Sequence, residues 1–276
     1  MTSQASSPGE SCVGVGGFKG SVSVLDLNAE RFKWKVPTAH SGIVNSIDGI
    51  SSTSAQLVSG SRDGTVKIWD IRIPDPVLTI ESSRGKVDCW SVCYGNVIDD
   101  HDRVVVAGYE SGDVRLIDLR NNKVRWEKTL KNGVCHVSFD RKDIPMNKLA
   151  AACLNGELAV FDMRTFNEES GFAGLANNIC KSTLWGCHFL PQDREIMAVN
   201  SGNGEVALLR YSYPPHRSVK DSHEKSIGVA GSLECVGRSD FISSQPLTAF
   251  DWHSAKRGLF ATVSFDQVLT VCICNL

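Results

Sequence analysis

The sequence predicts an all-β fold of repeated antiparallel blades, a β-propeller, on three observations. A glycine recurs at positions 20, 64, 112, 156 and 204, at intervals of 44 or 48 residues. Each of these glycines is followed by a short alternating segment rich in β-branched residues. Most are also preceded by two further segments of strand-like composition. Three or four short strands in every ~40–45 residues are the period expected of a propeller blade.

The recurring glycine marks a tight turn that leads into a strand. In most copies it follows Asp, Asn or Ser, and glycine accepts the positive φ of a short hairpin turn without strain. A sixth copy is degenerate, because Gln267 stands where the glycine is expected. The six copies of turn and strand are residues 19–26, 63–70, 111–118, 155–162, 203–210 and 266–273.

Two more strands are predicted upstream of most turns. A second strand of each blade is expected at residues 12–16, 56–61, 103–109, 148–154, 195–201 and 258–264. A first strand is expected at residues 43–47, 88–94, 133–139, 183–189 and 247–252. The first copy has no first strand in this prediction, and the last copy ends at its third strand.

The organisation that follows is a single propeller domain over residues 12–276, with about five complete blades and a partial one. Residues 1–11 are rich in Ser, Gly and Pro and are expected to be a disordered tail. Such a ring would leave two exposed sheet edges. We therefore expect an N-terminally truncated form of a seven-bladed ring. The long insertion at residues 211–244 is expected to carry the outer strand of its blade at residues 229–236. Its charged part, residues 216–225, is either a solvated loop or a functional one.

Composition excludes several classes of function. The 29 basic and 31 acidic residues nearly balance and form no basic cluster, so nucleic acid is not a predicted partner. No secretory signal and no run of about 18 apolar residues occurs, which excludes a membrane span. The ten cysteines form no C-x-x-C pair and are expected to be reduced, structural thiols. No phosphate-binding loop, dinucleotide fingerprint or H-E-x-x-H motif is present, so no enzyme, catalytic residue, metal or cofactor is predicted.

One repeat carries a Trp-Asp dipeptide at residues 69–70, and the sequence resembles the WD-repeat family, which is named for it. In that family a His, a Ser or Thr, an Asp and the Trp form a buried hydrogen-bonded network within a blade. The residues that match are His40, Ser59 or Ser61, Asp63 and Trp69. A Ser/His/Asp set also invites a catalytic interpretation. The structural role is favoured, because buried polar groups must be satisfied and this network satisfies them.

Within WD-repeat proteins the chain is most similar to the Monad-like family of dynein axonemal assembly factors. The matching stretches are residues 43–50, 60–70, 131–135, 139–149, 160–165, 181–183, 228–232 and 256–259. Residues 139–149 are the most specific, because the repeat itself does not require them. The similarity runs from about residue 17 to the end, whereas the family has further propeller sequence at the start.

This resemblance implies a cytoplasmic scaffold that acts with a co-chaperone assembly in building axonemal dynein arms for cilia or flagella. The implied partners are RuvB-like ATPases, a prefoldin-like module, a TPR adaptor and dynein chains. A modulating role in apoptosis is also implied. An alternative stays open, a substrate receptor of a cullin-type ubiquitin ligase. It is suggested by Asp-x-Arg endings of third strands at residues 70–72, 118–120 and 162–164.

Partner binding is predicted at the start of the first strands. In WD-repeat proteins, the second position of that strand and the residue two before it rim the face around the central channel. The residues that match are Ile43 with Asn45, Asp88 with Trp90, and Thr183 with Trp185. Trp often anchors protein interfaces. The alternative is that both Trp side chains pack between neighbouring blades.

Overall fold

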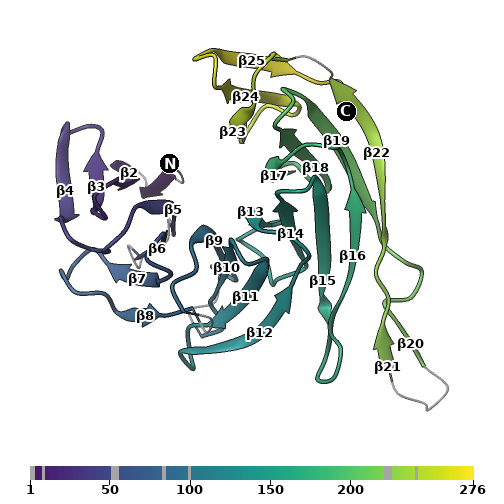
Figure 1. Ribbon diagram of the computed structural model, residues 1–276, viewed down its shortest axis with the longest axis horizontal. Coiled ribbons are helices and arrows are strands. Elements are labelled where there is room, and N and C mark those ends of the chain that lie inside the picture. The colour runs from purple at the N-terminus through teal and green to yellow at the C-terminus, as the bar shows by residue number, and fades with distance from the viewer. Residues whose placement is uncertain are drawn as a thin grey trace. The chain divides into compact units, whose positions relative to one another are not determined.

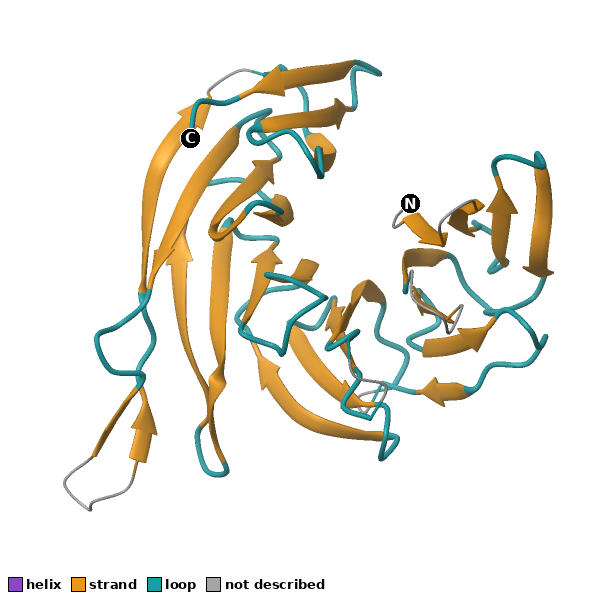
Figure 2. Ribbon diagram, turned by 180° about the vertical axis from the view of Figure 1, so that it is seen from behind, coloured by secondary structure: helices purple, strands orange, loops and turns teal. Residues whose placement is uncertain are grey.

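The computed structural model describes residues 4–7, 10–50, 56–82, 85–98, 101–220, 226–239 and 242–276. Every regular element in these ranges is a β-strand (Figure 2). The described residues contain no helix that is long and apolar enough to cross a membrane. The chain divides into two compact units, Met1–Val134 and Cys135–Leu276. The fold is the expected all-β propeller type, and each unit contains three blade sheets.

The first unit consists of three four-stranded antiparallel sheets, in each of which the strands follow one another as a meander (Figure 1). The first sheet is β1 (Gln4–Ser7), β2 (Glu10–Gly16), β3 (Val22–Asp26) and β4 (Arg31–Val36). The second is β5 (Val44–Gly49), β6 (Gln56–Ser61), β7 (Val66–Asp70) and β8 (Leu78–Ile80). The third is β9 (Cys89–Gly95), β10 (Val104–Tyr109), β11 (Asp113–Asp118) and β12 (Lys123–Thr129).

The second unit has two four-stranded sheets, one three-stranded sheet and an extra hairpin. Its first sheet is β13 (Val134–Phe139), β14 (Lys148–Cys153), β15 (Glu157–Asn167) and β16 (Gly171–Asn178). The next is β17 (Leu184–Leu190), β18 (Asp193–Ser201), β19 (Val206–Ser212) and β22 (Ser232–Ser239). The last sheet is β23 (Leu247–Trp252), β24 (Leu259–Ser264) and β25 (Leu269–Ile273). The hairpin of β20 (Ser218–Lys220) and β21 (Ser226–Gly228) lies between β19 and β22 in sequence.

The predicted first, second and third strands lie within a few residues of their expected positions. Five four-stranded sheets and one three-stranded sheet also match the predicted five blades and a partial one. The prediction that no strand precedes residues 12–16 was wrong. Gln4–Ser7 forms β1 and pairs with β2 from Gln4↔Val13 to Ser7↔Glu10. Polar composition suggested disorder, but the open edge of β2 offers main-chain hydrogen bonds to any side chain sequence. Residues 1–3 and 8–9 of that tail lie outside the described ranges.

The insertion is more regular than a solvated loop. The expected outer strand is present as β22, which pairs with β19. The charged segment contributes β20 and the start of a hairpin, whereas its residues 221–225 lie outside the described part of the chain. The single-domain boundary at residues 12–276 stays a prediction.

The hydrophobic core lies between consecutive sheets. In the first unit, Val24 of β3 packs in one cluster with Ile47 of β5 and Trp69 of β7. In the second unit, Phe250 of β23 and Phe260 of β24 pack with Ile196 of β18. Each inner face therefore needs the neighbouring sheet for burial, which is why a single blade does not bury its own core.

The turn between the second and third strands has one backbone conformation in all six copies. The five glycines of the repeat have φ between 79° and 88°. Gln267 of the degenerate copy adopts the same region, at φ 66°. At Gly156 a side chain is excluded outright, because a Cβ would lie 2.0 Å from the carbonyl oxygen of Cys180. The glycine column thus reflects both the positive φ and a close backbone approach.

Candidate protein-binding rim

The second sheet contains a hydrogen-bonded network around His40. His40 Nδ1 lies 3.2 Å from Asp63 Oδ2, and His40 Nε2 lies 2.7 Å from Ser59 Oγ. Trp69 Nε1 donates to the same Ser59 oxygen at 2.8 Å. Thr65, which the sequence did not single out, donates to Asp63 and contacts His40 Nδ1. Ser61 takes no part in these contacts with His40. Its hydroxyl accepts from the Asp63 amide instead.

The connectivity from Ser59 through His40 to Asp63 is that of a catalytic triad, but its burial favours the structural role. Ser59 is fully buried and His40 is 4% exposed, so a substrate has no access to the hydroxyl. Burial lowers the pKa of His40 despite the neighbouring Asp63 carboxylate. For Asp63, burial acts to raise the pKa. Hydrogen bonds donated by Thr65 and the Ser41 amide outweigh it and lower this pKa to about 2.

In the first unit, the rim residues predicted from the sequence lie against the turns between second and third strands. The Arg62 amide donates to the Ile43 carbonyl, and the Glu110 amide donates to the Asp88 carbonyl. The Arg62 guanidinium also reaches Asp88, with Nε 3.3 Å from Oδ2. Sequence reasoning missed Arg62 and Glu110. The signal was available, because they hold the same position two residues before the repeat glycine.

Asn45 and Trp90 lie at the same end of β5 and β9. Asn45 is exposed, and its amide Nδ2 donates to the Cys89 carbonyl at 3.0 Å. The Trp90 side chain is half-buried. This burial lies between that of an exposed interface anchor and that of a side chain packed between blades, the two alternatives raised by the sequence. Arg62 keeps 64% of its side chain exposed and Asp88 22%. This end of the unit therefore carries both a charged pair and a half-buried indole.

The rim of the second unit is built in the same way. The Gly202 amide donates to the Thr183 carbonyl at 2.8 Å, which places the turn of the second sheet against the start of β17. Trp185 is 37% exposed. A Cβ on Gly202 would lie 3.6 Å from the indole Nε1 of Trp185, so the indole lies against this turn. Leu154, at the equivalent turn of the preceding sheet, is also exposed, at 38%.

Side chains of one first strand hold the backbone of the next first strand. Ser46 Oγ accepts from the Val92 amide at 3.1 Å, between β5 and β9. His136 Nδ1 accepts from the Cys187 amide at 3.3 Å, between β13 and β17. The His136 ring also lies 4.7 Å from the His188 ring, centroid to centroid. Burial and the neighbouring His136 lower the pKa of His188 well below its ordinary value.

A buried ionic cluster joins the first two sheets of the second unit. Lys148 Nζ lies 3.1 Å from Asp140 Oδ2, and both side chains are fully buried. Tyr213, which follows β19, accepts hydrogen bonds from Lys148 and from Asn147. Arg217 of the insertion stacks on Tyr213 and reaches Asp162 at 3.4 Å. The insertion is therefore attached to the neighbouring sheet by specific contacts.

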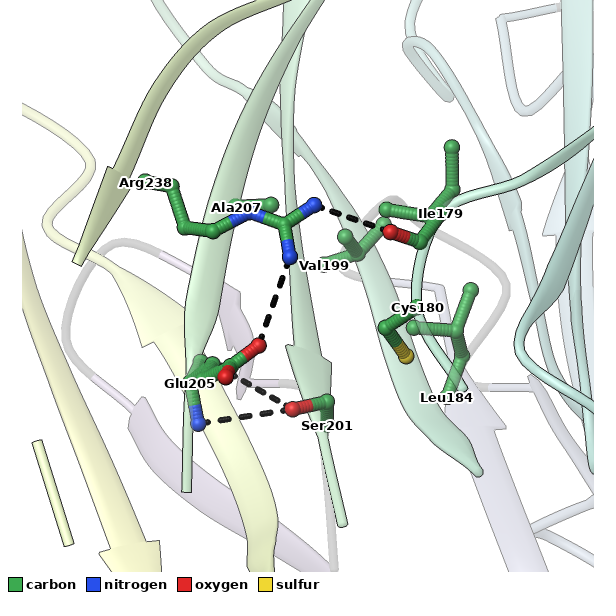
Figure 3. A pocket seen from close by; sticks show the side chains of 8 residues that line it. All are labelled: Ile179, Cys180, Leu184, Val199, Ser201, Glu205, Ala207 and Arg238. Atoms are coloured by element: carbon green, nitrogen blue, oxygen red, sulfur yellow. Dashed lines mark hydrogen bonds and ion pairs between the residues drawn. The ribbon is translucent and has the colours of Figure 1, made fainter. Parts of the chain in front are cut away.

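A pocket of about 170 Å³ opens beside β19 and β22 (Figure 3). Its walls are mostly apolar, and Arg238 crosses it. The Arg238 guanidinium donates to the Ile179 carbonyl at 2.8 Å and lies 3.4 Å from Glu205 Oε2. The polar groups of this pocket already bind one another, which favours a role in packing over ligand binding. In the described ranges, no group of three or more His, Cys, Asp or Glu side chains is placed to hold a metal ion.

Comparison with known proteins identifies the family. Residues 33–70 match the model of the WD domain, G-beta repeat. Dynein axonemal assembly factor 10 of Chlamydomonas reinhardtii is 44% identical over 278 residues, which cover 98% of this chain and 77% of that protein. The human protein of the same description is 45% identical, over 94% of this chain and 74% of its own length.

The chain belongs to the dynein axonemal assembly factor 10 family. The family extends to a more distant relative in Dictyostelium discoideum, 23% identical over 94% of this chain. The similarity covers both units, so the whole described fold, and not one repeat alone, is shared with these proteins. The expected resemblance to WD-repeat dynein assembly factors is thereby confirmed.

Proposed function

We propose that this chain is a protein-interaction scaffold that takes part in the assembly of axonemal dyneins. The observation that carries the proposal is its 44% identity, over 98% of its length, to a protein named for dynein axonemal assembly. The fold supports a scaffold, because the functional residues of such a fold lie on loops held by rigid sheets. The set of Ser59, His40 and Asp63, which has the connectivity of a catalytic triad, is buried.

Within that role, we propose a cytoplasmic co-chaperone adaptor for cilium or flagellum assembly. Its partners would be RuvB-like ATPases, a prefoldin-like module, a TPR adaptor and dynein chains. The contact residues would be the two rims, with Ile43, Asn45, Asp88 and Trp90 on the first unit. Thr183 and Trp185 would act on the second. Tryptophan is among the residues that most often dominate the binding energy of protein interfaces.

The alternative of a ligase receptor rested on repeated Asp-x-Arg endings, and these have a local explanation. Asp70, Asp118 and Asp162 each accept a hydrogen bond from the backbone amide two residues later. The carboxylates therefore cap turns in their own blades. Arg72 pairs with Asp70 in the same turn. The recurring turn therefore accounts for the Asp of the motif, and Asp26 accepts the same bond from the Asn28 amide without an Arg at that position.

Affinity purification of the tagged protein from a ciliated cell, followed by mass spectrometry, tests the proposal. Recovery of dynein chains, RuvB-like ATPases or the TPR adaptor supports it. Recovery of cullin-adaptor subunits in their place would favour the ligase receptor. The double variant Trp90→Ala/Trp185→Ala should lose these partners while its urea unfolding midpoint stays close to that of the unaltered chain. Leu27→Ala is the matched control, because Leu27 is exposed in the turn between β3 and β4.

A further inference from the structure

The rim of the first unit is a continuous surface of alternating turns and linkers. The His40 amide donates to the Gly20 carbonyl, and a Cβ on Gly42 would lie 2.8 Å from the Asp63 amide nitrogen. A Cβ on Gly64 would likewise lie 3.4 Å from the Cα of Lys86. These contacts put the turn at residues 18–20 against residues 40–42. Residues 40–42 in turn touch the turn at residues 62–64, and that turn touches residues 86–87.

The surface continues to the end of the third sheet. The Glu110 amide bonds to the Asp88 carbonyl, and the Leu130 amide bonds to the Gly112 carbonyl. Residues 130–132 therefore lie beside the turn at 110–112. All six segments belong to the end of the sheets at which second strands turn into third strands.

This rim carries more positive than negative exposed charge. Among the described residues, the exposed cations are Lys19, Arg62, Lys86 and Lys131. The carboxylates that reach solvent on this rim are Asp88, which already pairs with Arg62, and the exposed Glu81 and Glu110. Asp63 is turned inward to the His40 network with 7% of its side chain exposed. In the described part of the chain, Lys19, Lys86 and Lys131 make no ion pair, so their charge is available to a partner.

The excess is local to this rim. At the opposite end of the same three sheets, the acidic and basic residues that the structure describes nearly balance. They are Asp26, Glu30, Asp70, Asp75, Asp102 and Asp118 against Arg31, Arg72, Arg103, Arg120 and Lys123. The equivalent turns and linkers of the second unit carry, among described residues, one lysine, Lys181, and one aspartate, Asp266. The net charge of the whole chain is −2, so the charge of this rim is opposite in sign to that of the chain.

Two apolar side chains belong to the same rim. Trp90 lies on β9, two residues after Asp88, and is half-buried, and the part-exposed Ile43 precedes β5. Ile43 and Asp88 are each bonded to the turns that carry Arg62 and Glu110. A partner that fits this rim must therefore supply negative charge around an apolar side chain.

We propose that the rim of the first unit binds an extended acidic peptide segment with one apolar anchor residue. The anchor packs on Trp90 and Ile43, and its flanking carboxylates meet Lys19, Arg62, Lys86 and Lys131. Complementary charge fixes the choice of partner and speeds association, while the indole supplies the buried contact. This inference rests on the proposed scaffold function and specifies the kind of partner that one of its two rims takes.

The test uses the full chain and a fluorescein-labelled twelve-residue peptide of Glu and Asp with one central Leu, followed by fluorescence anisotropy. The peptide should bind at 50 mM salt and weaken as salt rises to 300 mM. Lys19→Glu/Lys86→Glu should weaken binding about tenfold, since two attractive pairs become repulsive. Trp90→Ala should also weaken binding, and an unchanged urea midpoint should show that each variant is folded.

The matched control is Lys181→Glu, which reverses one charge on the rim of the second unit and should leave peptide binding unchanged. A copy of the peptide with Gln and Asn in place of its acids should not bind. The assignment is overturned if no binding occurs or if Lys19→Glu/Lys86→Glu and Lys181→Glu behave alike. It is also overturned if the uncharged peptide binds equally, or if a ten-nucleotide poly-uridine RNA binds as tightly as the acidic peptide. If the acidic peptide fails to bind while the chain still captures dynein chains from cells, the scaffold function stands and the acidic-peptide assignment falls.

Discussion

Replacing Ser59 by Ala should destabilise the second sheet, because one hydroxyl serves two buried partners. Trp69 Nε1 donates to Ser59 Oγ at 2.8 Å, and the same oxygen lies 2.7 Å from His40 Nε2. His40 Nδ1 faces the Asp63 carboxylate, so Nδ1 carries the proton and Nε2 accepts from the serine hydroxyl. The variant leaves an indole N–H and an imidazole nitrogen without a partner.

The expected loss follows from the burial of these groups. Trp69 is 1% exposed and His40 is 4% exposed, so water does not replace the missing hydroxyl. Each unsatisfied buried polar group costs about 1–3 kcal/mol. With two such groups, the free energy of unfolding should fall by about 2–6 kcal/mol, a large share of a typical total of about 5–15 kcal/mol.

A double-mutant cycle with Trp69→Phe measures how much of this loss belongs to the indole. Phenylalanine removes the N–H donor, so Ser59→Ala should cost less in that background. The coupling should be at least about 1 kcal/mol. Unfolding in urea gives the free energies, and hydrogen exchange of the β6 and β7 amides shows whether the loss is local. Ser138→Ala is the control, because its hydroxyl donates only to the adjacent Phe139 carbonyl and is half-buried.

Two results would refute the reasoning. A loss below about 0.5 kcal/mol would mean that the network contributes no more than an ordinary surface group. Additive costs of Ser59→Ala and Trp69→Phe would mean that the two side chains do not depend on one another. Either outcome would also reopen a functional interpretation of the Ser/His/Asp set.

Three further predictions concern the rest of the chain. Because the pKa of His188 is lowered in the folded chain, the unfolded chain binds a proton at this residue at a pH where the folded chain does not. The contribution of His188 to the free energy of unfolding should therefore be fully present above pH 6.5. It should fall toward pH 5 by at most about 1.4 kcal/mol per pH unit. In urea titrations, His188→Gln should flatten that slope. Gly204→Ala should cost more than about 3 kcal/mol, because its Cβ would lie 1.8 Å from a carbonyl oxygen. Gly85→Ala shares the positive φ, but with no described atom within 4 Å it should cost only about 1–2 kcal/mol in thermal unfolding. Lys148→Met should lower the free energy of unfolding by about 3–5 kcal/mol, because it leaves the Asp140 carboxylate buried without its cation. Adding Asp140→Asn should restore most of that stability. A double variant no more stable than Lys148→Met alone would contradict this.

The strands that sequence reasoning found and missed differ in burial. Most first, second and third strands are buried on one or both faces, so apolar and β-branched residues mark them, as in β10, which is buried throughout. The largely exposed β25 was found from its place in the repeat. Outer strands such as β4, and the hairpin strand β20, are largely exposed and carry no such pattern. β1 was missed for a related reason, since main-chain pairing with β2 does not require an apolar side chain.

The rim shows the same division at the level of function. Ile43, Asp88 and Thr183 were predicted from their position in the repeat, but their neighbours were not. Arg62 and Glu110 are 19 and 22 residues away along the chain, and backbone hydrogen bonds bring them against those residues. Family resemblance supplied the rim position, whereas the composition of the surface depends on which turns meet which linkers.

The sequence by itself determined the fold class, the repeat and the family. It did so because glycines at the turns and apolar residues in the buried strands recur at a regular spacing along the chain. It also singled out His40, Asp63 and Trp69, since each occupies a fixed place in one blade, but it left Ser59 and Ser61 as alternatives and missed Thr65. Only the tertiary structure decided which charged side chains lie on the same surface and which are neutralised in ion pairs. Asp63 and Asp88 are both rim carboxylates in sequence, yet Asp63 turns into the His40 network and Asp88 pairs with Arg62 across two sheets. Charge that reaches solvent depends on contacts between distant segments, which no local pattern of residues specifies.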